Sequence, residues 1–158
     1  MTFWDYFTPC AASFIACLGF CITFNFHNWK HSVASSLVGA LGWYIYLLFA
    51  FTGNDILQFF IATIAISICS EILARLFKAP VTGFVLVALL PLVPGGGIYH
   101  TMRYCIAGNI PLFIEKCLHT FGIAGAIAVG VMLVSSSVRL LTLIHTTKAE
   151  STGVRPAK

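Results

Sequence analysis

The sequence predicts an all-α, polytopic membrane protein, because the chain is too apolar and carries too few charges to fold in water. Of its 158 residues, 59% are hydrophobic and 9% are charged, whereas a soluble domain carries roughly 25% charged residues. The mean hydropathy of +0.94 supports the same class. This composition excludes an ordinary soluble enzyme and a disordered chain. The net charge of +4 is scattered along the chain, so no nucleic-acid partner is expected either.

Five apolar stretches are candidates for membrane spans, each of which takes about 20 residues. They cover residues 7–24, 33–51, 56–74, 81–99 and 112–141. We expect all five to be α-helices, since only a helix satisfies its backbone hydrogen bonds within one segment in lipid. The fourth stretch is broken by prolines and glycines, so the number of spans is four or five. The last is longer than a bilayer requires, and its ends are expected to project or tilt.

The two ends of the chain and one short turn complete this organisation. A membrane domain is expected over residues 1–145, and the polar residues 146–158 are expected to form a flexible tail. The T-G-N-D turn at residues 52–55 is so short that the second and third spans must lie antiparallel.

The lysines and arginines predict the orientation of the chain in the membrane. With five spans, seven of the nine fall on one side. These are Lys30, Arg75, Lys78, Arg139, Lys148, Arg155 and Lys158. Arg103 and Lys116 fall on the other side. The positive-inside rule therefore predicts an outer N-terminus and a cytoplasmic C-terminus.

The break in the fourth stretch is the most informative local pattern. Two prolines and three glycines fall within seven residues there: Pro91, Pro94, Gly95, Gly96 and Gly97. Proline removes a helix donor and clashes with the preceding turn, so a second helix is expected to start at the glycines and run to a cap at Gly108. Its first N–H groups would be free to bind an anion. Discontinuous helices of this kind form substrate sites in transporters.

Two further residues extend this candidate substrate site. Tyr99 and Arg103 lie four apart and share one face of the second helix, and the planar guanidinium group of arginine suits a carboxylate. The alternative is that the prolines and glycines form a plain loop that ends the fourth span, with Arg103 simply outside the membrane. The sequence leaves both interpretations open.

The same residues carry a resemblance to a known family. The motif A-L-L-P-L-V-P-G, followed shortly by a tyrosine, matches Pro91, Pro94, Gly95 and Tyr99. Roughly residues 1–145 resemble the small YjjB-type subunit of the threonine/serine exporter (ThrE) family. Gly96, Gly97 and Arg103 lie outside the family pattern, so their assignment depends on local chemistry alone.

The resemblance implies a function, a location and partners. It implies a subunit of a bacterial inner-membrane exporter of small carboxylated metabolites. In that membrane, the orientation predicted from the lysines and arginines makes the N-terminus periplasmic. The cargo would be succinate for the split YjjB-type proteins, or threonine and serine for the long-chain relatives. A larger YjjP-type membrane protein would be the partner, and five spans fit one half of a transporter.

Glu71 is the single acid well inside an apolar stretch, and two roles are open for it. An intramembrane carboxylate is a candidate coupling group for transport. Arg75 follows four residues later, in the order that favours an ion pair on a helix. The sequence therefore allows either a coupling role or an ion pair at the membrane boundary.

Other functions receive less support from the residue pattern. No nucleophile, phosphate-loop or metalloprotease motif is present in the sequence, so we expect no enzyme activity, no catalytic residue and no cofactor. The six cysteines form no C-x-x-C pair, and no metal site is predicted. Rows of small residues, such as Gly122, Ala126 and Gly130, suit close helix packing, either within the chain or between copies in a homo-oligomer. A non-transport scaffold subunit is therefore the alternative function.

Overall fold

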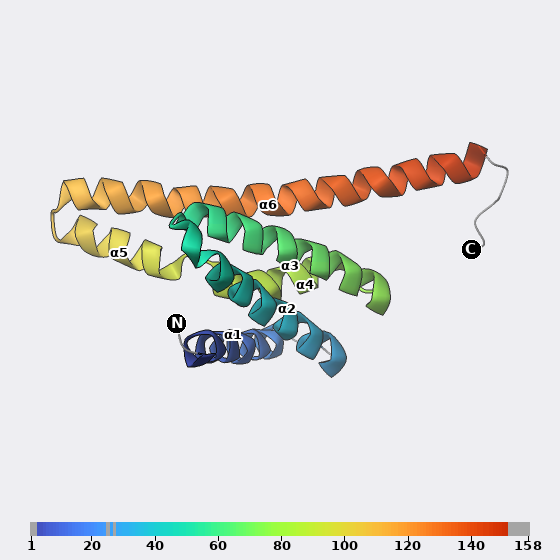
Figure 1. Ribbon diagram of the computed structural model, residues 1–158, viewed down its shortest axis with the longest axis horizontal. Coiled ribbons are helices and arrows are strands. Elements are labelled where there is room, and N and C mark those ends of the chain that lie inside the picture. The colour runs from blue at the N-terminus through green and yellow to red at the C-terminus, as the bar shows by residue number, and fades with distance from the viewer. Residues whose placement is uncertain (1–2, 25, 27, 152–158) are drawn as a thin grey trace.

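The computed structural model describes residues 3–24, 26 and 28–151, and these form a helical bundle without any strand (Figure 1). Six α-helices and two short 3-10 helices follow one another along the chain. They are α1 (Phe3–Thr23), α2 (Trp29–Leu48), η1 (Phe49–Thr52), α3 (Asp55–Phe77), α4 (Val81–Leu89), η2 (Leu90–Leu92), α5 (Gly95–Ile106) and α6 (Ile110–Ser151). The predicted all-α class is confirmed.

The structure also supports the predicted number of membrane spans. Four helical segments are long and apolar enough to cross a membrane: Tyr6–Thr23, Trp29–Thr52, Asp55–Phe77 and Ile110–Ile144. A fifth span is present if Val81–Leu92 and Gly95–Ile106, which meet at an angle of 51°, count as one broken helix. The break is therefore a real bend between two helices. The second helix ends at Ile106, beyond residue 99, where the fourth apolar stretch was expected to end, and close to the predicted cap at Gly108.

The turns before α3 and after α5 have the conformations that their glycine and asparagine residues favour. Asn54 caps α3, and its Oδ1 accepts hydrogen bonds from the amides of Ile56 (3.2 Å) and Leu57 (3.4 Å). The preceding Gly53 supplies the left-handed conformation (φ 66°) that the turn requires. Gly108, the expected cap after α5, is also left-handed (φ 70°). Both predicted turns are confirmed.

Helix α1 is fastened to the bundle by a row of small polar side chains. Ser13, Cys17 and Cys21 recur every four residues and face the interior. They donate to the carbonyl oxygens of Gly39 (3.4 Å), Val87 (3.4 Å) and Ser32 (3.7 Å), respectively. Pro91 has no N–H to offer the carbonyl of Val87 four residues earlier, and this oxygen accepts from the Leu90 amide and from the Cys17 thiol. The thiol is therefore part of the packing, as a buried small apolar residue would be.

Close contacts at glycines define how the helices run. Gly42 of α2 touches Ile66 of α3, and Tyr46 stacks on Phe59 with ring centroids 4.7 Å apart, so α2 and α3 are antiparallel as predicted. In α6, Gly122 lies against Ile56 and Gly130 against Thr63. Helices α3 and α6 are therefore parallel, and the small-residue row of α6 serves packing within the chain.

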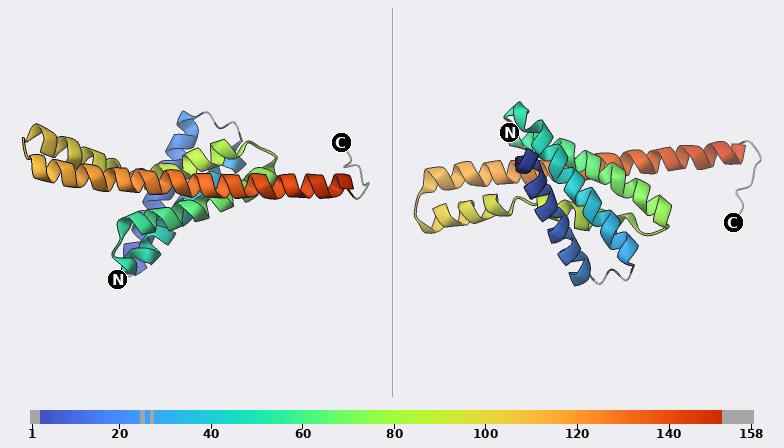
Figure 2. Two further views of the ribbon diagram at one scale, coloured as in Figure 1. Left: turned by 90° about the horizontal axis from the view of Figure 1, so that it is seen from above. Right: turned by 60° about the horizontal axis from the view of Figure 1, so that its bottom comes forward.

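This register leaves both ends of α6 beyond the rest of the bundle. Residues from 122 to about 144 lie beside α3, whereas the residues before 122 project past the start of α3 together with α5 (Figures 1 and 2). The other end continues to Ser151, past residue 146, where the sequence predicted the tail to begin. Residues 152–158 lie outside the described part of the chain. A helix of 42 residues is about 63 Å long, twice the thickness of a bilayer core.

Candidate transport site at the break between α4 and α5

The break consists of two residues that cannot continue a helix. Val93 is extended (φ −60°, ψ 127°), and Pro94 caps α5 with φ −75° and ψ 58°. The amide of Val93 still bonds to the oxygen of Leu90 (3.2 Å), and the amide of Gly95 bonds to the oxygen of Val93 (2.7 Å). The chain therefore leaves η2 in an ordered turn, and α5 starts at the first glycine, as the sequence predicts.

The first turn of α5 leaves its backbone accessible. The N–H groups of a first helical turn have no acceptor within their own helix. A Cβ atom built on Gly95 or on Gly96 would meet no atom within 4 Å. The Gly96 amide is thus free of intrahelical bonds and uncovered by a side chain, whereas the Gly95 amide, equally uncovered, already bonds to the oxygen of Val93. An uncovered helix start of this kind can bind an anion.

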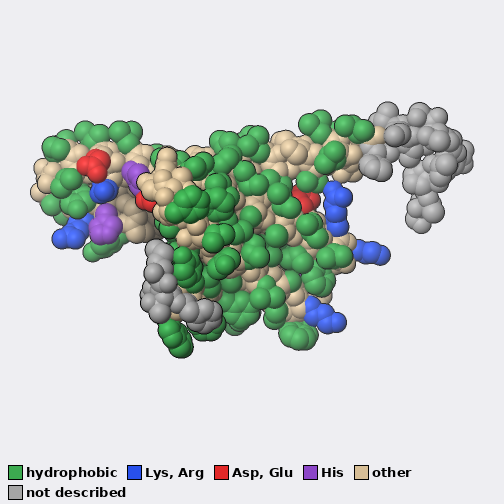
Figure 3. All heavy atoms as spheres, viewed as in Figure 1, with side chains coloured by type: hydrophobic (Ala, Val, Ile, Leu, Met, Phe, Trp, Pro, Cys, Tyr) green, Lys and Arg blue, Asp and Glu red, His purple; other side chains and the backbone are tan. Residues whose placement is uncertain are grey.

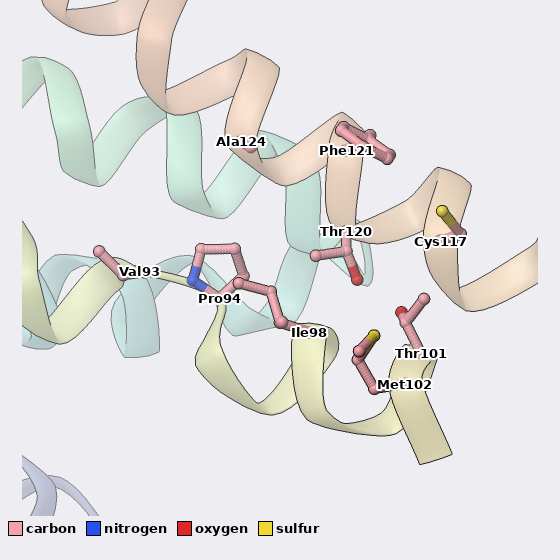
Figure 4. Close-up of a pocket in the computed structure, with 9 residues that line it drawn as sticks. All are labelled: Val93, Pro94, Ile98, Thr101, Met102, Cys117, Thr120, Phe121 and Ala124. Atoms are coloured by element: carbon pink, nitrogen blue, oxygen red, sulfur yellow. The ribbon is translucent and has the colours of Figure 1, made fainter. Parts of the chain in front are cut away.

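A groove of about 380 Å³ lies beside this helix start, between α5 and α6 (Figure 4). Its walls come from the break, from one face of α5 and from the facing side of α6. The lining residues are Val93, Pro94, Ile98, Thr101, Met102, Cys117, Thr120, Phe121 and Ala124. None of them is charged, so the groove offers a carboxylate no ionic partner of its own.

The two threonines of the groove are already engaged. The Thr101 hydroxyl donates to the oxygen of Gly97 (2.8 Å), and the Thr120 hydroxyl donates to the oxygen of Lys116 (2.7 Å). These bonds stay within each helix, and both oxygens retain lone pairs that can accept a hydrogen bond. Gly97 faces Thr120 so closely that a Cβ would lie 2.6 Å from Oγ1, so the third glycine permits the contact between α5 and α6.

The structure brings only some of the predicted site residues together. Pro94 lines the groove, and Gly97 closes it against α6. Tyr99 and Arg103 are exposed and absent from the groove lining. Pro91 instead lines a separate crevice with Trp43 and residues of α1. Arg103 lies in the last turn of α5, at the opposite end of the helix from the glycines and outside the groove.

The comparison with protein families places the break within a known group of membrane proteins. The family model described as "Threonine/Serine exporter, ThrE" matches residues 9–137, from α1 through most of α6. The chain belongs to the ThrE family. No curated protein and no solved structure matches it. ThrE-family membership makes the chain a multi-pass membrane exporter of the threonine/serine type, and hence a transporter.

In this ThrE-family chain, Glu71 lies far from the helix start of α5. It is half-buried on α3, and no ion pair joins it to Arg75 among the described residues. The parallel register of α3 and α6 separates Glu71 from the level of Gly97 by about 18 residues of helix, or about 27 Å. If Glu71 is a coupling residue, it therefore acts at a distance from the start of α5, from the opposite half of the bundle.

Sequence reasoning missed the α6 wall of the ThrE-family groove. Cys117, Thr120, Phe121 and Ala124 sit in an apolar stretch that looks like any other lipid-facing helix. Their spacing of three to four residues places them on one face, but nothing local says that α5 folds back onto that face. The Gly108 cap is the available signal, since a tight turn after a short helix brings the next helix alongside it.

Proposed function

We propose that this ThrE-family chain is one subunit of an inner-membrane exporter of small carboxylated metabolites. The cargo is a dicarboxylate of the succinate type or threonine and serine. The chain acts with a larger YjjP-type membrane partner, its N-terminus in the periplasm and its C-terminus in the cytoplasm. The observation that carries the proposal is the uncovered helix start of α5 at a 51° break in a membrane span.

The proposed site binds the carboxylate and the rest of the cargo at different places. The amides of Gly96 and Gly97 receive the carboxylate, and Arg103, in the last turn of α5, adds a positive charge from the exposed face of the helix. The aliphatic part of the cargo enters the groove, whose volume of about 380 Å³ falls in the range of small-molecule sites. Because the groove is open on one side, the partner subunit supplies the missing wall and the alternating access.

Efflux measurements test this proposal. We expect cells that express the chain with its partner to export labelled succinate, or threonine and serine, faster than cells that lack either protein. Reconstituted vesicles loaded with one compound at a time then identify the cargo. Equal efflux of all three compounds with and without the chain would contradict the proposal.

Glu71 is the proposed coupling residue. Replacing it by glutamine removes the charge and keeps the shape, so we expect export to fall to the rate that remains when the proton gradient is collapsed, and its pH dependence to flatten. The measurement is the initial efflux rate at several external pH values. Glu115→Gln is the matched control, because Glu115 is exposed and pairs with its neighbour Lys116 (3.2 Å). A wild-type rate with a wild-type pH profile in the Glu71 variant would dismiss the coupling role.

The alternative function, a non-transport scaffold subunit, receives less support in this fold. The argument for a scaffold was that rows of small residues could pack one chain against another. Gly39 packs against Cys17 and Ala88, and Gly122 and Gly130 pack against α3. These contacts lie within the chain, so the rows supply no free interface for assembly.

A further inference from the structure

Four cationic side chains gather at the end of the bundle opposite the α5–α6 hairpin. Lys30 begins α2, Arg75 and Lys78 end α3, and Arg139 lies on α6, and all four are exposed. Figure 3 shows lysine and arginine side chains grouped at this end of the molecule, with acidic colouring beside them. This basic end patch, defined as these four residues, has no part in the proposed transport site.

The helix register brings the four residues to nearly one level. The antiparallel contact of Gly42 with Ile66 places Lys30 opposite Lys78. The parallel contact of Gly130 with Thr63 places Arg139 within one turn of Arg75. From Arg139 to Lys78 the patch spans about two turns, or about 9 Å along the bundle axis. That depth corresponds to a single layer of lipid headgroups.

The patch is not neutralised by the protein. The ion pairs found among the described residues, Lys116–Glu115 and His119–Asp55, both lie at the other end of the bundle. Glu71 is the one acidic residue of this half whose side chain is described, and it forms no ion pair with the four cations. Among the side chains that the structure describes, the patch therefore carries about three net positive charges without a paired counter-charge.

Lys78 has the most unusual backbone conformation of the four residues. It ends α3 in the left-handed conformation, with φ 50° and ψ 42°. It is the one described residue other than glycine with a positive φ. That position favours glycine, because a Cβ atom costs roughly 1–2 kcal/mol in this conformation. A positive charge is itself favourable at the C-terminal end of a helix, so the charge of Lys78 and its backbone conformation have separate effects on stability.

An aromatic side chain marks the depth of the patch. Trp29 precedes Lys30 at the start of α2 and is 73% exposed. Tryptophan is enriched at the level of lipid headgroups. Cations gathered at that level, here at the ends of α2 and α3 and on the adjoining part of α6, attract anionic headgroups.

We propose that the basic end patch is a binding site for the headgroup of an anionic phospholipid. The ligand is a phosphodiester with net negative charge, as in phosphatidylglycerol. Arg75 and Arg139 bind its phosphate oxygens through their planar guanidinium groups, and Lys30 and Lys78 supply point charges on either side. Trp29 lies in the same interface.

Titration of the purified full-length chain in detergent tests this site. The probes are short-chain phosphatidylglycerol, phosphatidylcholine of equal chain length, and soluble glycerol phosphate, with the shift in melting temperature as the readout. We expect phosphatidylglycerol to bind more tightly than phosphatidylcholine, with an affinity that falls as salt rises. Each cation near an anionic lipid contributes a factor of about five, so the Arg75→Gln/Arg139→Gln variant is expected to bind about 25-fold more weakly.

Two further variants separate the lipid site from folding. Arg103→Gln/Lys116→Gln removes the same charge from the opposite end and is expected to keep the wild-type affinity. Lys78→Gly relieves the left-handed strain, so we expect an equal or higher melting temperature without lipid together with an affinity lowered about fivefold. Equal binding of phosphatidylcholine, competition by glycerol phosphate at the concentration of the lipid, or an unchanged affinity in Lys78→Gly would each overturn the proposal.

Discussion

Replacing Gly39 by alanine is expected to destabilise the bundle by about 1–3 kcal/mol, as overpacking in a filled core does. A Cβ atom at this position would lie 2.5 Å from the Sγ atom of Cys17 and 3.5 Å from the backbone of Ala88. Neither neighbour can yield easily, because Cys17 and Ala88 are fully buried. Gly42→Ala is expected to act in the same way through its contact with the buried side chain of Ile66.

Thermal unfolding in detergent measures this effect, and Gly19→Ala is the matched control. A Cβ on Gly19 would meet nothing within 4 Å, although the residue lies in α1. It gains the helix propensity that alanine adds, roughly 0.5–1 kcal/mol, without the clash. The melting temperature should therefore fall for Gly39→Ala and hold or rise for Gly19→Ala. Equal melting temperatures for both variants would show that α1, α2 and α4 do not pack as described.

Replacing Gly95 and Gly96 by alanine is expected to reduce export by about tenfold or more while the fold persists. A hydrogen bond to a charged group contributes about 1.5–3 kcal/mol, and each 1.4 kcal/mol is a factor of ten. Methyl groups at the helix start hold the cargo carboxylate away from the amides. They meet nothing within 4 Å in the protein itself, so the stability of the chain should not suffer.

Gly125→Ala is the control for this pair of substitutions. Gly125 also has open space around it and lies on α6, outside the lining of the groove at the break. Efflux is measured for each variant beside its melting temperature and its yield in the membrane. Wild-type export by the Gly95/Gly96 variant would remove the helix start of α5 from the transport site. A loss of export accompanied by a loss of folded protein would instead show that the two glycines are needed for folding.

The break was predictable because its causes are local. Pro91 and Pro94 lack amide hydrogens, and three successive glycines place no side chain on the next turn, wherever the chain folds. The same is true of the turn at Gly53 and Asn54 and of the cap at Gly108, which the structure confirms. Local chemistry of this kind needs no knowledge of neighbouring helices.

The groove beside the break was not predictable, because its second wall comes from another helix. Thr120 and Phe121 follow Pro94 by more than 25 residues, and only the folding back of α5 places them opposite Ile98 and Met102. Tyr99 and Arg103 share a face as expected, but the rotation of α5 directs that face away from the groove. The sequence defines which residues share a helix face, and packing decides what that face meets.

The sequence by itself determined the environment and the local architecture of this protein. Few charges and long apolar stretches required lipid as the solvent, and lipid required helices with proline and glycine confined to breaks and turns. The tertiary structure decided the pairings: α3 lies parallel to α6, and Glu71 is remote from the start of α5. Those pairings depend on where a missing Cβ lets two helices touch. Such close contacts join residues far apart in the chain, so no local pattern reports them.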